Sequence, residues 1–167
     1  VVGLYNTFEA AIAQKVRRLV FSSSCQAVCG YPLETTITGQ MMPAPVSLYG
    51  ATKALGEVMG RWYHDKHQLE FVALRIGWFQ SYEEAEKNFR NKPSPHGRAL
   101  WLSPKDAVQL LCCSAEAPSV GYCIAGGTSK TKPEWLSLQQ SRDVLGYFPE
   151  DDADQLFGPP PPASASA

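Results

Sequence analysis

Apolar residues recur every three or four positions over residues 1–14 and 48–67, and this spacing predicts two amphipathic helices. Ser47 directly precedes the second segment, where its hydroxyl can cap the first turn. Two further helix starts are indicated by a hydroxyl residue, a proline and an acid within four positions, at 103–106 and 131–134. The pattern therefore predicts four helices.

Three short and largely apolar runs lie between these helices. Residues 19–21 lead into three serines, residues 71–76 end at Gly77, and residues 122–125 end at two glycines. Their length and composition are typical of strands that are buried on both faces. Helices that alternate with such strands predict the α/β class, and the sheet is expected to be parallel because parallel strands need a crossover connection.

The remaining segments are polar or rich in proline. Residues 81–98 carry many charges and two prolines, so we predict a loop or a mobile insert there. Residues 158–167 contain almost nothing to bury and are predicted to be a disordered tail, which leaves one domain over residues 1–157. Gly56 and Gly60 lie on one face of a predicted helix, where they would let another helix approach closely.

Composition and charge argue against several classes of function. The chain has 167 residues, a formal net charge of −1 and a pI of about 6.3, so no basic surplus indicates a nucleic-acid or lipid partner. No apolar run reaches the roughly 18–20 residues that span a bilayer. The five cysteines lack paired spacing, which argues against disulfides or zinc and favours reduced thiols in the cytoplasm. His64 and His67 have no third ligand nearby, so we expect no metal site.

The residues that can carry chemistry are Ser24, Tyr49 and Lys53. Tyr49 and Lys53 lie four positions apart, on one face of a predicted helix. A lysine cation favours the phenolate form of a nearby phenol, which can then exchange a proton with a substrate hydroxyl. Ser24 follows a predicted strand, at the sheet edge where ligands of α/β proteins bind. For the tyrosine and lysine alone, a surface pair without a function is the alternative.

Three stretches resemble the NAD(P)-dependent epimerase/dehydratase family of extended short-chain dehydrogenases. They are VRRLVFSSS (16–24), SLYGATKALGE (47–57) and ALRIG (73–77). The resemblance extends from residue 1 to about residue 152. It implies that the chain forms the C-terminal part of a Rossmann-type doubly wound parallel sheet, incomplete, with a small C-terminal substrate region.

The resemblance also implies roles for individual residues. In the family, residues that match Ser24, Tyr49 and Lys53 are catalytic. The cofactor, NAD or NADP, lies against positions that match Tyr49, Lys53, Ile76 and Gly77. No G-x-x-G-x-x-G loop follows a strand anywhere in the 167 residues. We therefore expect the glycine-rich front half of the parent enzyme to be missing from this sequence, and the cofactor is doubtful for the chain alone.

Within the family, the chain resembles uronate dehydrogenase-like proteins most, through WLSPKD (101–106) and GGTS (126–129). Residues 77–80 lack the Asn-x-x-Gly-Pro pattern of sugar-nucleotide epimerases, which favours a free sugar or sugar acid as substrate. The expected substrate contacts are Ser24, Cys25, Gln26, Trp78 and Arg98. Three of these depart from the family pattern, because Cys25 and Gln26 replace Asn-His and Trp78 replaces a serine.

Three hypotheses about function follow from the resemblance. The first is an NAD(P)-dependent oxidoreductase that acts on a sugar or sugar acid, with Tyr49 as acid and base. The second is an epimerase or dehydratase of the same family, which regenerates its cofactor in each cycle. The third is a shortened, non-catalytic relative that binds partners. Helices that match residues 1–14 and 47–67 form a homodimer interface in the family, so a homodimer through them is expected.

Overall fold

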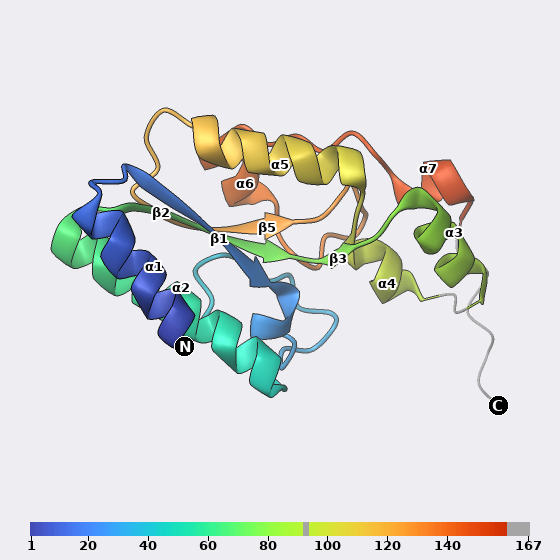
Figure 1. Cartoon of the computed structure of the whole chain (residues 1–167). Helices are drawn as coiled ribbons and strands as arrows, with labels where there is room; N and C mark the ends of the chain where they lie inside the picture. Colours follow the sequence, from blue (N-terminus) through green and yellow to red (C-terminus); the bar gives the residue numbers. More distant parts are fainter. Residues whose placement is uncertain (92–93, 160–167) are drawn as a thin grey trace.

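The centre of the molecule is a parallel sheet of three strands (Figure 1). The computed structural model describes residues 1–91 and 94–159. The strands are β1 (Arg18–Ser24), β2 (Glu70–Ile76) and β5 (Tyr122–Gly127), and they lie in the order β1–β2–β5. The predicted α/β class and the parallel sheet are confirmed, and all three predicted strands are present.

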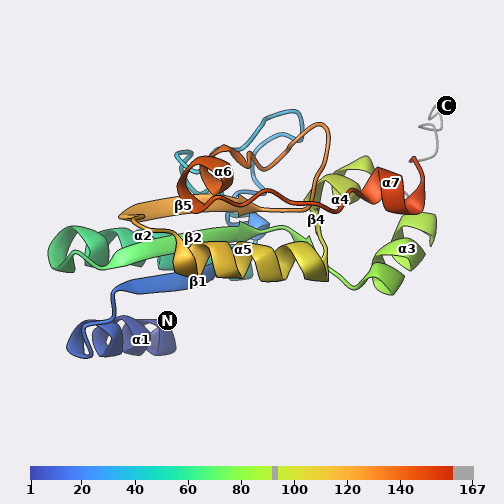
Figure 2. The same cartoon turned by 90° about the horizontal axis from the view of Figure 1, so that it is seen from above.

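Helices cover both faces of the sheet. Helices α1 (Val2–Ala13) and α2 (Leu48–His67) lie on one side, while α5 (Pro104–Glu116) lies on the other (Figure 2). Helix α6 (Gln139–Leu145) packs against β5 and α5 on that second side. Both faces of the strands are apolar for this reason, as in other doubly wound sheets. No helix among the described residues has the length and apolar content to cross a membrane.

Aromatic rings fill the space between the sheet and the pair α1 and α2. The rings of Phe8 and Tyr63 stack with centroids 4.4 Å apart, and Phe71 of β2 lies beneath them. Gly56 and Gly60 of α2 face this layer. A Cβ atom on Gly60 would lie 2.2 Å from the Phe71 ring, so the glycines admit aromatic side chains of the strands. The expectation that they admit a second helix was wrong.

The segment predicted to be a loop contains two helices, α3 (Tyr82–Asn91) and α4 (Pro95–Leu100). The prediction was wrong because it followed the many charges and overlooked two apolar positions, of which Phe89 is the larger. Phe89 and Trp101 are buried against the last residue of α7 (Ala153–Phe157), with ring centroids 5.6 Å and 5.3 Å away. We call α3, α4 and α7 together the C-terminal lobe.

Two short strands connect this lobe to the sheet. They are β3 (Trp78–Phe79), which follows β2 directly, and β4 (Trp101–Leu102), which precedes α5. The two pair in parallel, with Trp78 opposite Trp101. Of the tail predicted to be disordered, residues 160–167 lie outside the described part of the chain.

Of the two helix starts predicted at 103–106 and 131–134, the first is confirmed and the second was wrong. Ser103 caps α5 as expected, because its Oγ accepts the backbone N–H of Asp106 at 3.1 Å. No helix begins at residues 131–134. The backbone beyond them pairs with Ile37 instead, whose N–H donates to the Trp135 carbonyl at 2.7 Å. Helix α6 therefore starts later, and Glu134 accepts the N–H of its capping residue, Leu138, at 3.1 Å.

Candidate active site

Ser24 lies at the carboxyl end of β1, where the chain turns into the short 3-10 helix η1 (Cys25–Ala27). Its backbone is extended, and its Oγ accepts the N–H of Gln26 at 3.2 Å. This hydrogen bond caps η1 and fixes the position of the hydroxyl. Ser24 is opposite Ile76 in the β1–β2 register, and Ile76 is opposite Gly127 in the next pair of strands. The three residues therefore lie side by side at one edge of the sheet.

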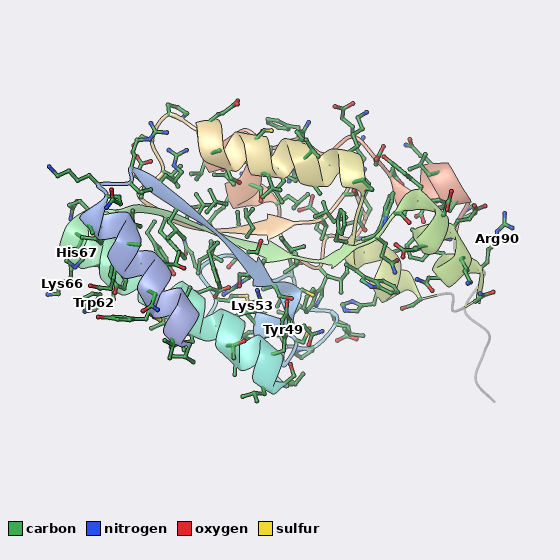
Figure 3. All side chains as sticks on the ribbon, in the orientation of Figure 1. Tyr49, Lys53, Trp62, Lys66, His67 and Arg90 are labelled. Carbon is green, nitrogen blue, oxygen red and sulfur yellow. The ribbon has the colours of Figure 1, made fainter. Side chains whose placement is uncertain are left out.

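Tyr49 and Lys53 lie on the first turns of α2, close to the end of β1 (Figure 3). The Lys53 ammonium donates to the carbonyl of Ser22 at 2.7 Å and lies 5.4 Å from the centroid of the Tyr49 ring. The strand that carries Ser24 therefore holds the lysine beside the tyrosine. Tyr49 is 54% exposed, so its ring is accessible to a ligand.

Gly50 explains how the start of α2 reaches the serine loop. A Cβ atom on Gly50 would lie 2.2 Å from the carbonyl oxygen of Gln26, so only glycine allows this contact. The capping bond of Ser47, whose Oγ accepts the Gly50 N–H at 3.0 Å, starts the helix at that point. The motif that carries Ser24 and the motif that carries Tyr49 and Lys53 therefore lie next to each other.

Two of the positions expected to meet the cofactor lie at the end of β2, where Ile76 is the last residue of the strand and Gly77 follows it. Gly77 donates its N–H to the carbonyl of Gly127 at 2.9 Å, and a Cβ atom on it would lie 2.1 Å from the Leu100 carbonyl. The glycine is therefore required by the close approach of α4. Ile76 lines a groove of about 350 Å³ that has only apolar side chains around it.

These residues fit one end of a dinucleotide and leave the other end without a partner in the sequence. The Lys53 ammonium and the Tyr49 hydroxyl offer polar groups for a ribose, whereas the groove that Ile76 lines is walled by α5, on the other face of the sheet from α2. A pyrophosphate would need a glycine-rich loop at a helix N-terminus, and the 167 residues contain no G-x-x-G-x-x-G. The described part of the chain also contains no cluster of metal-binding side chains.

The expected substrate contacts are spread over two environments. Trp78 is 42% exposed and Gln26 is half-buried, so both can meet a ligand. The Cys25 side chain is packed in an apolar cluster with Trp135, and burial raises the pKa of its thiol to about 11. Cys25 therefore stays protonated and acts as an apolar residue in this structure.

Arg98 is buried in the C-terminal lobe and is already engaged. Its Nη1 donates to Asp154 Oδ1 at 2.9 Å and to the Gly158 carbonyl at 2.7 Å, and its guanidinium lies over the Phe89 ring. Its Nε has no hydrogen-bond acceptor among the described residues. Arg98 lines a separate cavity, which none of the three catalytic candidates lines.

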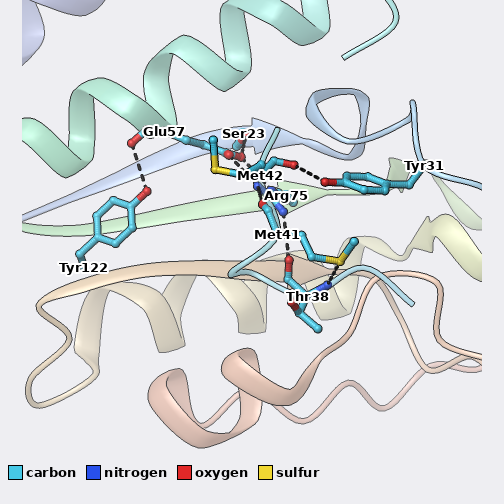
Figure 4. A network of polar contacts seen from close by, with 8 residues as sticks. All are labelled: Ser23, Tyr31, Thr38, Met41, Met42, Glu57, Arg75 and Tyr122. Carbon is cyan, nitrogen blue, oxygen red and sulfur yellow. Dashed lines mark hydrogen bonds and ion pairs between the residues drawn. The ribbon is translucent and has the colours of Figure 1, made fainter. Parts of the chain in front are cut away.

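A buried ion pair between α2 and β2, which the sequence interpretation overlooked, supports the candidate active site (Figure 4). Glu57 of α2 and Arg75 of β2 are each 1% exposed and form two hydrogen bonds, of 3.0 Å and 2.8 Å. The Ser23 hydroxyl donates to the same carboxylate at 2.6 Å. Glu57 and Arg75 both lie inside the stretches quoted above, and an acid and an arginine in otherwise apolar surroundings are the signal that could have revealed them.

The ion pair connects four segments around the candidate active site. Arg75 also donates to the carbonyls of Thr38 and Met41, at 3.1 Å and 3.2 Å, so it holds the loop between η1 and α2. The Tyr122 hydroxyl donates to the backbone carbonyl of Glu57 at 3.2 Å. Helix α2, strand β1 and this loop are therefore fixed relative to β2, and with them Ser24, Tyr49 and Lys53.

Comparison with known proteins agrees with this arrangement. The sequence profile of the NAD dependent epimerase/dehydratase family matches residues 1–99, and the chain belongs to this family. The chain is 34% identical over 168 residues to an NAD-dependent glucose-6-phosphate dehydrogenase of Haloferax volcanii, a match that covers 92% of this chain and 61% of the relative. It is 32% identical over 166 residues to an L-arabinose 1-dehydrogenase of the same organism, with 90% and 65% covered.

Solved structures of uronate dehydrogenases have the same fold. A variant of the enzyme from Agrobacterium tumefaciens, in complex with NAD, matches with a TM-score of 0.78 and 28% identity. The match covers 100% of this chain and 61% of that protein. The expected partial Rossmann-type fold and the resemblance to uronate dehydrogenases are confirmed. The chain spans 61% to 65% of the length of these relatives.

Proposed function

We propose that this chain carries the proton-transfer site of an NAD(P)-dependent oxidoreductase that acts on a sugar or sugar acid. The observation that carries the proposal is the position of Lys53, whose ammonium is bonded to the Ser22 carbonyl and lies beside the Tyr49 ring. The relatives named above, which are sugar and uronate dehydrogenases, support the same substrate class.

Each residue of the triplet has a separate role in this proposal. Tyr49 exchanges a proton with the substrate hydroxyl that is oxidised, or with the carbonyl oxygen in the reverse direction. Lys53 places its positive charge beside the Tyr49 ring, and the Ser24 hydroxyl donates a hydrogen bond to the same substrate oxygen. A bound nicotinamide supplies the hydride chemistry. Tyr49, Lys53, Ile76 and Gly77 would hold it on the protein side.

We also propose that the protein forms a homodimer through α1 and α2. Several large side chains on these helices are at least half exposed, among them Tyr5, Val58 and Trp62. A patch of this kind is typical of a surface that is covered in an assembly. Sedimentation at several concentrations would test the proposal, and a Val58→Glu variant that shifts the protein to a monomer would support it.

The proposed reaction is tested in a full-length enzyme that contains this sequence, by NAD(P)-linked absorbance changes over a panel of aldoses and uronic acids. Tyr49→Phe should lower kcat by about 100-fold or more, because a positioned acid and base contributes 10²–10⁴ in rate. Tyr5→Phe is the matched control and should keep full activity, because it keeps the exposed ring on the proposed dimer surface and removes only the hydroxyl. Equal activity of the Tyr49→Phe variant would contradict the role of Tyr49. Sugar conversion seen by NMR without net cofactor reduction would indicate an epimerase instead.

A further inference from the structure

A cavity of about 440 Å³ lies beside the candidate active site and is separate from it. Residues 33–36, helix α4, residues 130–135 and the start of α7 line it, whereas Ser24, Tyr49 and Lys53 do not. Its volume lies in the range of roughly 300–1,000 Å³ that is usual for small-molecule sites. The cavity is therefore large enough for a ligand of its own.

Hydrogen-bond donors and hydrogen-bond acceptors both line this cavity. Hydroxyls come from Thr35, Thr36 and Thr131, and carboxylates from three of the lining segments. Arg98 is 7% exposed, and its Nε lacks an acceptor among the described residues. A buried donor without an acceptor is unfavourable, so a ligand oxygen that completed this bond would be stabilised.

One wall of the cavity is aromatic. Trp135 is buried between the cavity and the apolar cluster that contains Cys25, and its ring meets the edge of the His96 ring with centroids 4.9 Å apart. Apolar and aromatic walls with a few convergent polar groups are the usual composition of a small-molecule site. The wall offers a surface for the C–H groups of a ligand whose oxygens meet the polar side chains.

The charged side chains that line the cavity have no positive surplus. Four carboxylates and three cationic groups line it. Asp154 forms an ion pair with Arg98, and the carboxylate of Glu134 pairs with Arg142, which lies outside the cavity. Burial lowers the pKa of His96, which therefore adds no positive charge near neutral pH. A surplus of positive charge, which would favour a carboxylate or a phosphate, is absent among the described lining residues.

We propose that this cavity binds a small, uncharged, polyhydroxylated molecule of the aldose type, and that it selects against the corresponding sugar acid and sugar phosphate. Arg98 contributes a hydrogen-bond donor to the ligand, since Asp154 already neutralises its charge. The hydroxyls of residues 35 and 36 and the nearby carboxylates meet the hydroxyls of the ligand. The inference concerns binding alone, so it stands or falls independently of the proposed redox reaction.

The test follows tryptophan fluorescence of the purified chain without any cofactor during titration with D-glucose, D-glucuronate and D-glucose 6-phosphate. Glucose should give a saturable change, and the two anions should bind at least about tenfold more weakly. Added salt should leave the affinity for glucose unchanged, because no charge is recognised. Calorimetric titration gives the same affinities without an optical probe.

Variants assign the response to the cavity. Trp135→Phe should abolish the fluorescence change, and Trp62→Phe, at an exposed tryptophan of α2, should preserve it. Because Trp135 is buried, circular dichroism must show that the variant is folded. Thr36→Val, at an exposed position of the lining, should weaken glucose binding by calorimetry without unfolding the chain. No saturable binding of glucose, tighter binding of either anion, or full binding by Thr36→Val and Trp135→Phe would each overturn the proposal.

Discussion

Arg75 in the sheet region and Arg98 in the C-terminal lobe both have buried side chains, and the two are held differently. Arg75 in the sheet faces Glu57, and the side chains of both are almost completely buried, at 2% and 1% exposure. Arg98 in the lobe faces Asp154, whose side chain is 53% exposed. One ion pair is therefore enclosed by protein, whereas the other has water on one side.

The difference between the two ion pairs indicates how rigidly the structure of each region is held. A charge in an enclosed pair has no water to replace a lost partner, so the two charges and their hydrogen bonds depend on each other. A charge whose partner is exposed keeps access to solvent, which screens the interaction. We therefore expect the arrangement of α2, β1 and β2 to be rigid and the lobe to open more easily, and the following variants test this comparison.

The largest effect is expected for Arg75→Met. The change leaves the Glu57 carboxylate buried without its cation and removes the bonds to the Thr38 and Met41 carbonyls. The free energy of unfolding should fall by about 3–5 kcal/mol, as is typical when one partner of a buried pair is removed. Chemical denaturation measures the change, and we expect faster amide exchange in the loop between η1 and α2 as well.

The matched control for this prediction is the double variant with Glu57→Gln and Arg75→Met. It removes both charges, so a large part of the lost stability should return. If the double variant is as unstable as Arg75→Met alone, the loss arises from packing, and the description of the pair as an enclosed charge system is wrong.

The next effect concerns the aromatic contacts of the lobe. Phe89→Ala removes a buried ring that meets Trp101 and Phe157, and it should lower stability by about 3 kcal/mol. Hydrogen exchange should accelerate in α3, α4 and α7 and stay slow in β2. Equal acceleration in β2 would show that the lobe and the sheet unfold as one unit, which would remove the distinction between the two regions.

The same division between the sheet region and the C-terminal lobe separates the elements that could be predicted from the sequence from those that could not. The three strands and the helices at residues 1–14 and 48–67 follow from periodic or continuous apolar patterns, because local residues decide them. The lobe depends on contacts between residues far apart in the chain, such as Phe89 with Phe157. A short amphipathic helix among many charges looks like a loop until its distant partners are known.

Prediction of the candidate site residues was limited in the same way, by contacts between residues far apart in the chain. Ser24, Tyr49 and Lys53 could be placed together because a strand end and a helix start carry them, and the sheet brings these together. Arg98 could not be placed, because its environment is set by the carbonyl of Gly158 and by Asp154, both more than fifty positions away. Its role as a ligand contact stays a prediction.

A smaller effect is expected for Arg98→Met. The methionine keeps most of the packing over Phe89 but loses the bonds to α7 and to the Gly158 carbonyl. Stability should fall by about 1–2 kcal/mol, because the exposed Asp154 is solvated after the change. A loss as large as that of Arg75→Met in the same denaturation experiment would contradict the contrast between the two arginines.

The smallest effect is a pH dependence from His96 at the edge of the lobe. Burial lowers the pKa of this imidazole below its usual value of about 6.5, so the unfolded chain binds a proton more readily than the folded one. The folded state is therefore favoured above about pH 6.5, and part of this stability is lost as the pH falls through that value. His96→Gln cannot take up the proton. The difference in unfolding free energy between the two proteins should shift in favour of the variant as the pH falls from about 7.5 to 5.5, and a constant difference would mean that His96 is solvated in the native lobe.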